Sequence, residues 1–332
     1  MTTVAELRPV TSAGRATRRR GRRSVRGWMG ARLLGAMSAV LSRLPEVPLQ
    51  HAAHAFGGVL YRVQPGRRRL VRNNMARVVE YLANRGLGGE RVAAAARDPR
   101  ALDRLVRSAF GHYARGYVEV ATLRAYADEE RLERIRPDDP EMSRRAFEAD
   151  PGSMIIIGLH FGAIEIPALW ASRRLGRRIT APMESVADAD LQSYFERTRK
   201  QTGLNVIPLE RAASELRRAL GRGDTVALVA DRPVGGSGTP VELFGAPARL
   251  PIGSAILALE SGAPAWVIVT RRVGWNQYRS RMERIDVPPE GTRRERVNAF
   301  LAAQARAFEA AVADAPDQWW TTFFPIWEDI RS

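Results

Sequence analysis

Short apolar runs and amphipathic stretches alternate along the second half of the chain. The apolar runs have the length of strands and the amphipathic stretches repeat at helical spacing. The predicted strands cover 153–159, 179–183, 205–209, 225–230, 240–244, 265–271 and 277–286, and the predicted helices cover 163–174, 188–202, 211–222, 252–262 and 292–314. This alternation predicts an α/β fold in which helices flank a mixed, largely parallel central sheet. The last strand alternates polar and apolar residues most clearly, which is typical of an antiparallel edge strand.

The first half of the chain has a helical pattern and precedes the predicted sheet. Between residues 50 and 149, one apolar stripe is formed by Leu102, Leu105, Val106, Phe110, Tyr113, Tyr117 and Val120. An amphipathic helix is predicted at about 28–44. We expect a disordered basic arm (1–27), a helical membrane-proximal region (28–149) and an α/β core (150–330), with 28–330 forming one compact domain.

The chain is strongly basic. It has 52 Lys and Arg against 36 Asp and Glu, a formal net charge of +16, and Lys200 is its only lysine. Residues 1–26 hold eight arginines and one glutamate, so this segment alone carries +7. Such a balance favours anionic partners, namely phospholipid head groups, phosphate-bearing cofactors or nucleic acid. GC-rich codon usage, which raises the share of arginine and alanine together, is the alternative explanation, and the sequence leaves it open.

No segment has the length and uniform hydropathy of a membrane span. Arg32 and Arg43 interrupt the apolar stretch 28–45, and prolines and glycines interrupt 250–269. Residues 1–27 also lack the pattern of a cleavable signal peptide. A polybasic arm followed by an amphipathic helix is typical of a peripheral or monotopic protein on an anionic membrane surface. A helix packed on the protein core is the alternative.

The candidate chemistry centres on "IIIGLHFGAIEIPALW", residues 155–170, where a predicted strand ends and a predicted helix begins. His160 follows the strand, and ligand sites gather beyond the carboxyl ends of such strands, where a general base belongs. Glu165 falls in the first turn of the helix, where it could accept a hydrogen bond from one ring nitrogen of His160 and fix the tautomer. Backbone N–H groups at the helix start could stabilise an oxyanion. A cleft-lining histidine beside an unrelated glutamate is the alternative.

Residue types that the chain lacks narrow the reaction class. It contains no cysteine and no G-x-S-x-G motif, which excludes disulfides, thiolate nucleophiles and a serine elbow. A histidine–acid pair without its own nucleophile would activate a hydroxyl on the substrate, which predicts transfer to an alcohol without a covalent enzyme intermediate. His51, His54 and His112 have no further ligand types at a useful spacing, so we expect no metal site.

Taken together, several segments resemble the lysophospholipid acyltransferase superfamily. The most similar branch is that of the bacterial lipid A biosynthesis (lauroyl/myristoyl) acyltransferases, which includes the actinobacterial phosphatidylinositol mannoside acyltransferases. The family pattern H-x-x-x-x-D/E is matched by His160 and Glu165, and an arginine four residues before a glycine by Arg199. Further blocks are matched by "ADRPVGGSGTPVELFG" (230–245), "LPIGSAILALESGAP" (250–264) and "PDQWWTTFFPIW" (316–327). The resemblance covers roughly residues 28–328.

The resemblance implies roles for particular side chains. His160 would be the general base on an acceptor hydroxyl and Glu165 would orient it. Asp231, Arg232 and Arg249 would lie near the site. "HFGAIE" departs from the usual H-x-G-N-W-D/E of the family, which bears on the identity of the acceptor.

Two further expectations come from residue types. Arginine pairs well with phosphate, so Arg199, Arg232 and Arg249 are candidates to bind phosphate groups of donor or acceptor. Glu242 is acidic within a strand that otherwise looks buried, and we expect it to face the cleft. The tryptophan and phenylalanine cluster at 319–327 is expected to belong to the core.

The resemblance also implies the substrates and the location. The donor would be an acyl thioester, acyl-CoA or acyl carrier protein, acting as co-substrate, and no cofactor is expected. The acceptor would be a glycolipid, a phosphatidylinositol mannoside or a lipid A-like molecule, at the cytoplasmic face of the cell membrane. A thioesterase or lipid hydrolase using the same histidine–acid pair remains an alternative. A nucleic-acid-binding protein is a further one, although no aromatics interleave with the arginines, and we expect no nucleic-acid partner.

Overall fold

The computed structural model of the chain describes residues 25–122, 132–147, 152–184, 188–200, 203–234 and 238–330. The predicted arm 1–27 lies outside these residues except for 25–27, which begin α1. The described helices are α1 (Val25–Leu41), α2 (Glu46–Val63), α3 (Pro65–Asn84), α4 (Gly89–Arg97), α5 (Pro99–Ala121), α7 (Pro140–Phe147), α8 (Ile166–Arg174), α9 (Ala189–Lys200), α10 (Ala212–Gly221), α11 (Gly253–Ser261) and α12 (Arg293–Asp314). None of these helices combines the length and apolar character that crossing a bilayer requires.

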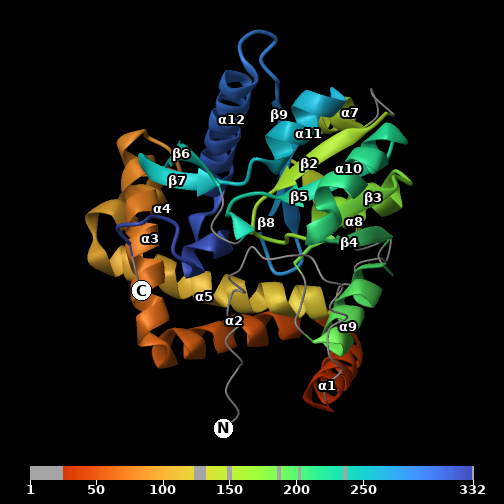
Figure 1. The fold of residues 1–332 in the computed structure, drawn as a ribbon. Coiled ribbons are helices and arrows are strands. Elements are labelled where there is room, and N and C mark those ends of the chain that lie inside the picture. The colour runs from red at the N-terminus through yellow and green to blue at the C-terminus, as the bar shows by residue number, and fades with distance from the viewer. Residues whose placement is uncertain are drawn as a thin grey trace.

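The central sheet has seven described strands in the order β1-β9-β8-β2-β5-β3-β4. They are β1 (Ile135–Pro137), β2 (Met154–Gly158), β3 (Ile179–Met183), β4 (Leu204–Pro208), β5 (Thr225–Val229), β8 (Ala265–Arg272) and β9 (Tyr278–Ile285). Neighbours in this sheet run parallel except for the β8–β9 pair. The predicted α/β class, with a mixed and largely parallel sheet preceded by a helical region, is confirmed (Figure 1).

The sequence pattern does not predict two of the described strands. β1 pairs with β9, with Ile135 opposite Tyr278, so β9 is antiparallel to β8 as predicted but is not an edge strand. The expected edge position of β9 is therefore wrong, since β1 forms the edge of the sheet. The sequence did not reveal β1 because it has only three residues, one of them a proline, and so shows no strand periodicity. β7 (Ala246–Leu250) pairs with β6 (Thr239–Leu243) in a separate two-stranded antiparallel sheet, so the predicted strand 240–244 lies outside the central sheet.

The buried strands supply two cores because their side chains alternate between the two faces of the sheet. Ile155 and Ile157 of β2 join the larger core, which includes residues of α10, α11 and α12. Met154 and Ile156 join a second core with residues of α7 and α8. Both faces of the sheet are thus covered by helices, as the near-continuous apolar run in β2 requires.

Helices α2 and α5 pack lengthwise against each other below the sheet (Figure 1). They run antiparallel, since Gln50 accepts a hydrogen bond from Arg115 (2.8 Å) while Gly58 lies beside Arg107. Two glycines allow the close approach. A Cβ on Gly57 would lie 2.3 Å from the carbonyl oxygen of Phe110, and a Cβ on Gly111 would lie 2.3 Å from the ring of His54.

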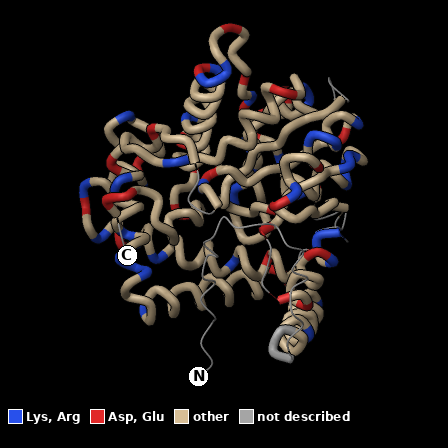
Figure 2. Tube along the Cα trace, in the orientation of Figure 1, with Lys and Arg blue, Asp and Glu red and all other residues tan. Residues whose placement is uncertain are grey.

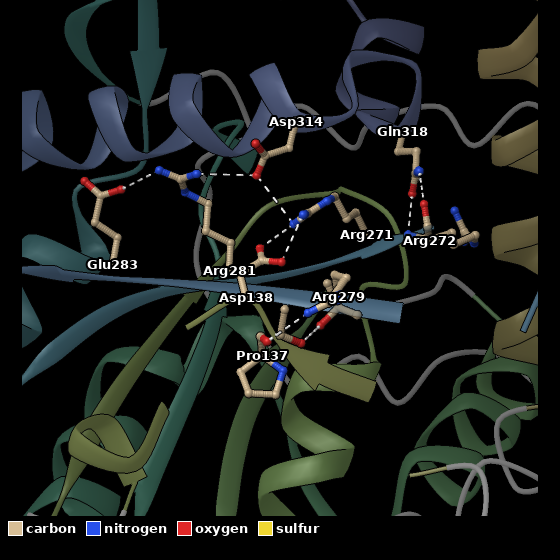
Figure 3. Close-up of polar contacts among 11 residues, drawn as sticks. Pro137, Asp138, Arg271, Arg272, Arg279, Arg281, Glu283, Asp314 and Gln318 are labelled. Atoms are coloured by element: carbon tan, nitrogen blue, oxygen red, sulfur yellow. Dashed lines mark hydrogen bonds and ion pairs between the residues drawn. The ribbon is translucent and has the colours of Figure 1, made fainter. Parts of the chain in front are cut away.

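Arginines at the β8–β9 side of the sheet connect strands to the last helix (Figure 3). Arg271 of β8 contacts Asp138, which follows β1, and Asp314 at the end of α12 (3.5 Å). Arg281 of β9 also reaches Asp314 (3.4 Å). Exposed ion pairs contribute only about 0–1 kcal/mol each. These ion pairs therefore add little to the stability of the fold. Their main effect is on how β1, β8, β9 and α12 align with one another.

The three histidines of the helical region pack against rings. His51 stacks on Trp275 (centroids 3.5 Å apart) and His54 lies edge-on to His112 (5.6 Å). Burial, partly opposed by the charge of Asp317, lowers the pKa of His112 to about 3. His112 is therefore neutral at physiological pH.

The α2–α5 contact predicts that Gly57→Ala destabilises the protein. The added methyl group would push on the Phe110 carbonyl, which is backbone and cannot turn away, so we expect a loss of about 1–3 kcal/mol in the free energy of unfolding. Gly66→Ala is the matched control, because a Cβ on Gly66 meets no atom within 4 Å. Urea unfolding of the two variants measures the difference, and equal stabilities would contradict the contact.

Neutral His112 predicts a pH-dependent stability. Its folded-state pKa is about 3 and its ordinary value is 6.5, so between these values the unfolded chain binds a proton that the folded chain does not. The free energy of unfolding should therefore fall as the pH decreases from 6.5, by up to about 1.4 kcal/mol per pH unit. His54, whose pKa burial also lowers, acts in the same direction. Urea unfolding at several pH values should show a shallower slope for His112→Gln than for the wild type.

Candidate active site

His160 lies just beyond the carboxyl end of β2, and Asp231 lies just beyond that of the neighbouring strand β5. The two strands are parallel and in register, with Gly158 opposite Val229. Each candidate residue therefore follows its strand end by two residues, and the register brings their backbones side by side. Nδ1 of His160 lies 2.7 Å from Oδ1 of Asp231. The side chain of His160 is 27% exposed and that of Asp231 is fully buried. The ring of His160 is therefore bound by a carboxylate in the protein interior and is accessible to a molecule from the solvent side.

Asp231 accepts hydrogen bonds at both carboxylate oxygens. Besides the ring of His160, Oδ2 accepts from the backbone N–H of His160 (3.0 Å), the indole of Trp319 (2.9 Å) and the hydroxyl of Thr321 (2.6 Å). Burial by itself would raise the pKa of Asp231. The charge of His160 and these hydrogen bonds outweigh burial and lower the pKa to about 2, so Asp231 is ionised at neutral pH. An ionised partner requires the proton on Nδ1 and leaves Nε2 free to accept one.

The C-terminal tail, which follows α12 and comprises residues 315–330, holds the turn that carries His160. Trp320 donates its backbone N–H to the carbonyl of His160 (2.7 Å), and Gly162 donates to the carbonyl of Gln318 (2.9 Å). Phe161 and Trp319 form an isolated antiparallel bridge between the same segments. Gly162 has φ +52°, and a Cβ there would lie 2.1 Å from the carbonyl oxygen of Thr270. This turn therefore requires glycine, and the tail fixes its position.

A buried ion pair supports the same turn from α5. Arg272, at the end of β8, bonds Glu119 of α5 through Nε (2.6 Å) and through its second terminal nitrogen. That nitrogen also donates to the carbonyl of Gly162 (3.0 Å), and Tyr278 donates to Glu119 (3.2 Å). The His160 turn is thus held by α5, β8 and the tail at once.

Glu165 does not form the hydrogen bond with His160 that the sequence predicted. Its Oε1 accepts hydrogen bonds from Nε (3.0 Å) and a terminal nitrogen (2.6 Å) of Arg199, at the end of α9. Among the hydrogen bonds of the described residues, none joins Glu165 to His160. The expected hydrogen bond is therefore wrong, because Asp231 already occupies Nδ1 and Glu165 begins α8, from which it meets α9. A catalytic role for Glu165 stays a prediction.

The other predicted site residues are distributed differently. Arg232 follows Asp231, bonds Glu184 beyond the end of β3 (3.2 Å) and lies over the ring of Phe324 (4.9 Å). Arg199 bonds Glu165 and also approaches the sulfur of Met183 (3.0 Å). The ends of β2, β5 and β3 and of α9 therefore bring His160, Asp231, Arg232, Glu184, Glu165 and Arg199 to one edge of the sheet.

Arg249 and Glu242 lie on the β6–β7 sheet. Arg249 donates to the carbonyl of Gly238 (3.0 Å), and Glu242 is exposed while its neighbour Leu243 is buried. The described hydrogen bonds link neither residue to His160 or Asp231. β6 is not the buried strand that the sequence suggested, because partly buried and exposed residues alternate along it before buried Leu243. That Glu242 faces the cleft stays a prediction. Phosphate binding by Arg249 stays a prediction.

A small hollow lies beside Glu165, between α5 and the start of α8. Its lining includes Gly116, Val120, Ile164 and Trp320. Trp319, Phe323 and Trp327 are buried, so the aromatic tail belongs to the core as expected. The N–H groups of Gly162 and Ala163 bond the carbonyls of Gln318 and Thr270, and an oxyanion site at this helix start stays a prediction.

Sequence reasoning placed Asp231 near the site but missed that it orients His160, and it missed Trp319, Thr321 and Glu184 as site residues. A usable signal was present, since the predicted strands 153–159 and 225–230 are each followed closely by a polar side chain. Parallel neighbours would place both side chains at one edge, but their adjacency in the sheet is not written in either strand.

Comparisons with known proteins concern the chain as a whole. The sequence profile of the family described as bacterial lipid A biosynthesis acyltransferase matches residues 15–327. A phosphatidylinositol mannoside acyltransferase of Mycolicibacterium smegmatis is 29% identical over 283 residues, which cover 82% of this chain and 84% of the relative. A phosphatidylinositol mannoside acyltransferase of Mycobacterium tuberculosis is 28% identical over 241 residues, covering 71% of this chain and 68% of the relative.

The His160–Asp231 contact predicts the tautomer of the ring. Neutral His160 should carry its proton on Nδ1, and that proton should resonate strongly downfield because it is shared with an ionised carboxylate. Asp231→Asn should remove this signal while the other three histidines keep theirs. NMR of the protein with ¹⁵N-labelled histidine measures this, with His160→Gln to assign the resonance. An Nε2-protonated ring in the wild type would contradict the arrangement.

Proposed function

The chain belongs to the bacterial lipid A biosynthesis acyltransferase family and is a lipid acyltransferase, and from this premise we propose that it is a membrane-associated O-acyltransferase with His160 as its general base. It moves a long-chain acyl group from an acyl thioester to a hydroxyl of a glycolipid. The observation that carries the proposal is the 2.7 Å contact between the partly exposed ring of His160 and buried Asp231.

The proposed reaction uses this pair in an addition and elimination at the thioester carbonyl. Nε2 of His160 takes the proton of the acceptor hydroxyl as its oxygen attacks the thioester carbonyl. Asp231, ionised and buried, stabilises the imidazolium that forms and keeps the ring in orientation. The tetrahedral intermediate collapses, the carbon–sulfur bond breaks, and His160 returns the proton to the leaving thiolate. The products are an ester and a free thiol, and no bond to the protein forms.

In this proposal Glu165 and Arg199 act as a pair. Arg199 forms hydrogen bonds with Glu165, the residue just before α8, and keeps its carboxylate turned toward α9. Coulombic attraction to Glu165 raises the pKa of Arg199, so its positive charge persists beside the site. Arg199 and Arg232 supply this charge for phosphate groups of the donor or the acceptor. The donor is acyl-CoA or acyl carrier protein, and no cofactor enters the step.

The proposed acceptor is a mannosylated phosphatidylinositol. The support is that relatives covering most of this chain are named phosphatidylinositol mannoside acyltransferases. A lipid A-like acceptor is the second candidate, because the family profile carries that description.

The proposed location is the cytoplasmic face of the cell membrane. The enzyme would bind there through its basic arm and α1, which spans Val25–Leu41 where a helix was predicted at about 28–44. α1 packs on α9 and α5, yet Trp28, Leu33 and Met37 remain exposed, at 48%, 70% and 43%. These exposed apolar side chains suit the interface of an anionic bilayer.

The proposal predicts that His160→Ala lowers acyl transfer by at least about a hundredfold, because general-base catalysis contributes roughly 10²–10⁴. The assay combines purified protein, a long-chain acyl-CoA and a panel of lipid acceptors. Transfer that persists in His160→Ala would overturn the proposed base. Salt-sensitive DNA binding unaffected by the substitution would instead favour a nucleic-acid-binding protein.

The same assay separates the roles of the two carboxylates. Asp231→Asn should lower kcat by about a hundredfold or more with little change in KM, because the ring loses its correct tautomer. Glu165→Gln should keep the tautomer and affect KM as well, since it releases Arg199. Similar losses in kcat alone for both variants would contradict this division of roles.

A thioesterase or lipid hydrolase is the second candidate, since water could take the place of the alcohol at the same pair. Release of free fatty acid without dependence on any acceptor would support hydrolysis. Acyl-lipid product that requires the acceptor would support transfer. Mass spectrometry of lipids from a deletion strain would then identify the acceptor.

A further inference from the structure

Helix α2 presents an apolar face that no described element covers. Phe56, Val59 and Val63 are 57%, 48% and 64% exposed, and Ala52 and Ala55 are exposed beside them. These positions recur every three or four residues and lie on one side of the helix. In Figure 1, α2 lies on the lower side of the molecule beside α1, with α5 between it and the sheet.

The opposite face of α2 is locked onto α5, so the exposed side chains cannot turn inward. Gly57 and Gly111 let the two backbones touch, and Gln50 of α2 accepts a hydrogen bond from Arg115 of α5 (2.8 Å). His51 stacks on Trp275 of the loop between β8 and β9 (3.5 Å). These contacts therefore fix the orientation of α2. Phe56, Val59 and Val63 form an apolar ridge on the side of the helix that faces away from α5.

Basic side chains border this ridge. Exposed Arg62 ends the helix, and Arg67 and Arg69 follow at the start of α3. Arg107 of α5 lies 3.7 Å from where a Cβ on Gly58 would stand. Glu46 is the only acidic residue of α2, and Figure 2 shows the helix uncharged along most of its length. An apolar ridge with a basic border is the pattern of a surface that lies in the interface of an anionic bilayer.

We propose that the outer face of α2 is a second membrane-docking surface, distinct from α1, which inserts Phe56, Val59 and Val63 among the lipids of an anionic bilayer. The charge pattern favours a bilayer over a second copy of this chain, because a symmetric dimer through this face would place one basic border against another. The inference rests on the proposed function only in that the enzyme must meet a membrane lipid. Because α2 is fixed to α5, and α5 holds the His160 turn through Glu119, docking through α2 would set the height of the site above the lipid.

Vesicle flotation with the full-length protein tests the proposal. The vesicles contain phosphatidylcholine alone or phosphatidylcholine with phosphatidylglycerol. Phe56→Ser/Val59→Ser should reduce binding to the anionic vesicles by at least about tenfold, since two inserted apolar side chains are lost. Leu87→Ser is the control, because Leu87 is 42% exposed on the turn between α3 and α4. Binding by the double variant equal to that of the wild type overturns the proposal.

Charge and occupancy are tested separately. Arg62→Gln/Arg107→Gln should weaken binding to the anionic vesicles and leave the weak binding to phosphatidylcholine unchanged; equal losses on both would overturn the role of the basic border. Light scattering measures the mass in solution. A wild-type dimer that Phe56→Ser/Val59→Ser converts to a monomer would assign the face to a second copy and overturn the proposal, whereas monomers in both support it.

Activity distinguishes failure of this surface from failure of the proposed function. Phe56→Ser/Val59→Ser should transfer acyl groups to a detergent-dispersed acceptor at the wild-type rate and lose transfer to an acceptor in vesicles. Loss in detergent as well would show damage to the site and contradict a docking role. If the wild type transfers no acyl group in either form, the proposed function fails, and flotation alone then decides the docking surface. Phe56→Ser/Val59→Ser and Arg62→Gln/Arg107→Gln should both unfold at the wild-type midpoint temperature, because the replaced side chains are exposed.

Discussion

A buried carboxylate that holds one imidazole in place is the interaction on which the site depends. Asp231 lies where water cannot solvate it, so its charge must be met by donors, and His160, Trp319 and Thr321 supply them. Removing any of these donors leaves the charge less compensated, which couples the ring, the strand ends and the tail energetically. The parallel register of β2 and β5 makes the contact possible without strain, because two strand ends already lie side by side.

Segments far apart in sequence converge on the His160 turn. The tail at 318–320 bonds the backbone of this turn, and α5 reaches it through Glu119 and Arg272. The helical N-terminal region is therefore in contact with the sheet through α5, and its packing bears directly on the site. This arrangement also explains why the aromatic tail is buried. The aromatic rings of the tail pack against the carboxylate of Asp231, and they exclude water from it.

The arginine excess serves several physical roles in the folded chain. Arg272 and Arg115 are buried and hydrogen-bonded within the core, where they join helices to strands and loops. Arg271 and Arg281 connect strands to α12 at the surface. Others, such as Arg67 and Arg69, are exposed, and they make the start of α3 basic. Composition alone could not separate these roles, since it records the charge and not the partner.

The sequence by itself determined much of the local structure. Apolar runs located the central strands β2, β3, β4, β5, β8 and β9, amphipathic stretches located the helices around them, and the strand-to-helix boundary placed His160 at a carboxyl edge. Only the tertiary structure decided which acid meets the imidazole, because that depends on which strand lies next to β2. Glu165 is five residues from His160 and bonds Arg199, whereas Asp231 is seventy-one residues away and bonds the ring. Periodicity records the environment of each residue, but the pairing of strands and the position of the tail follow from the packing of the whole chain.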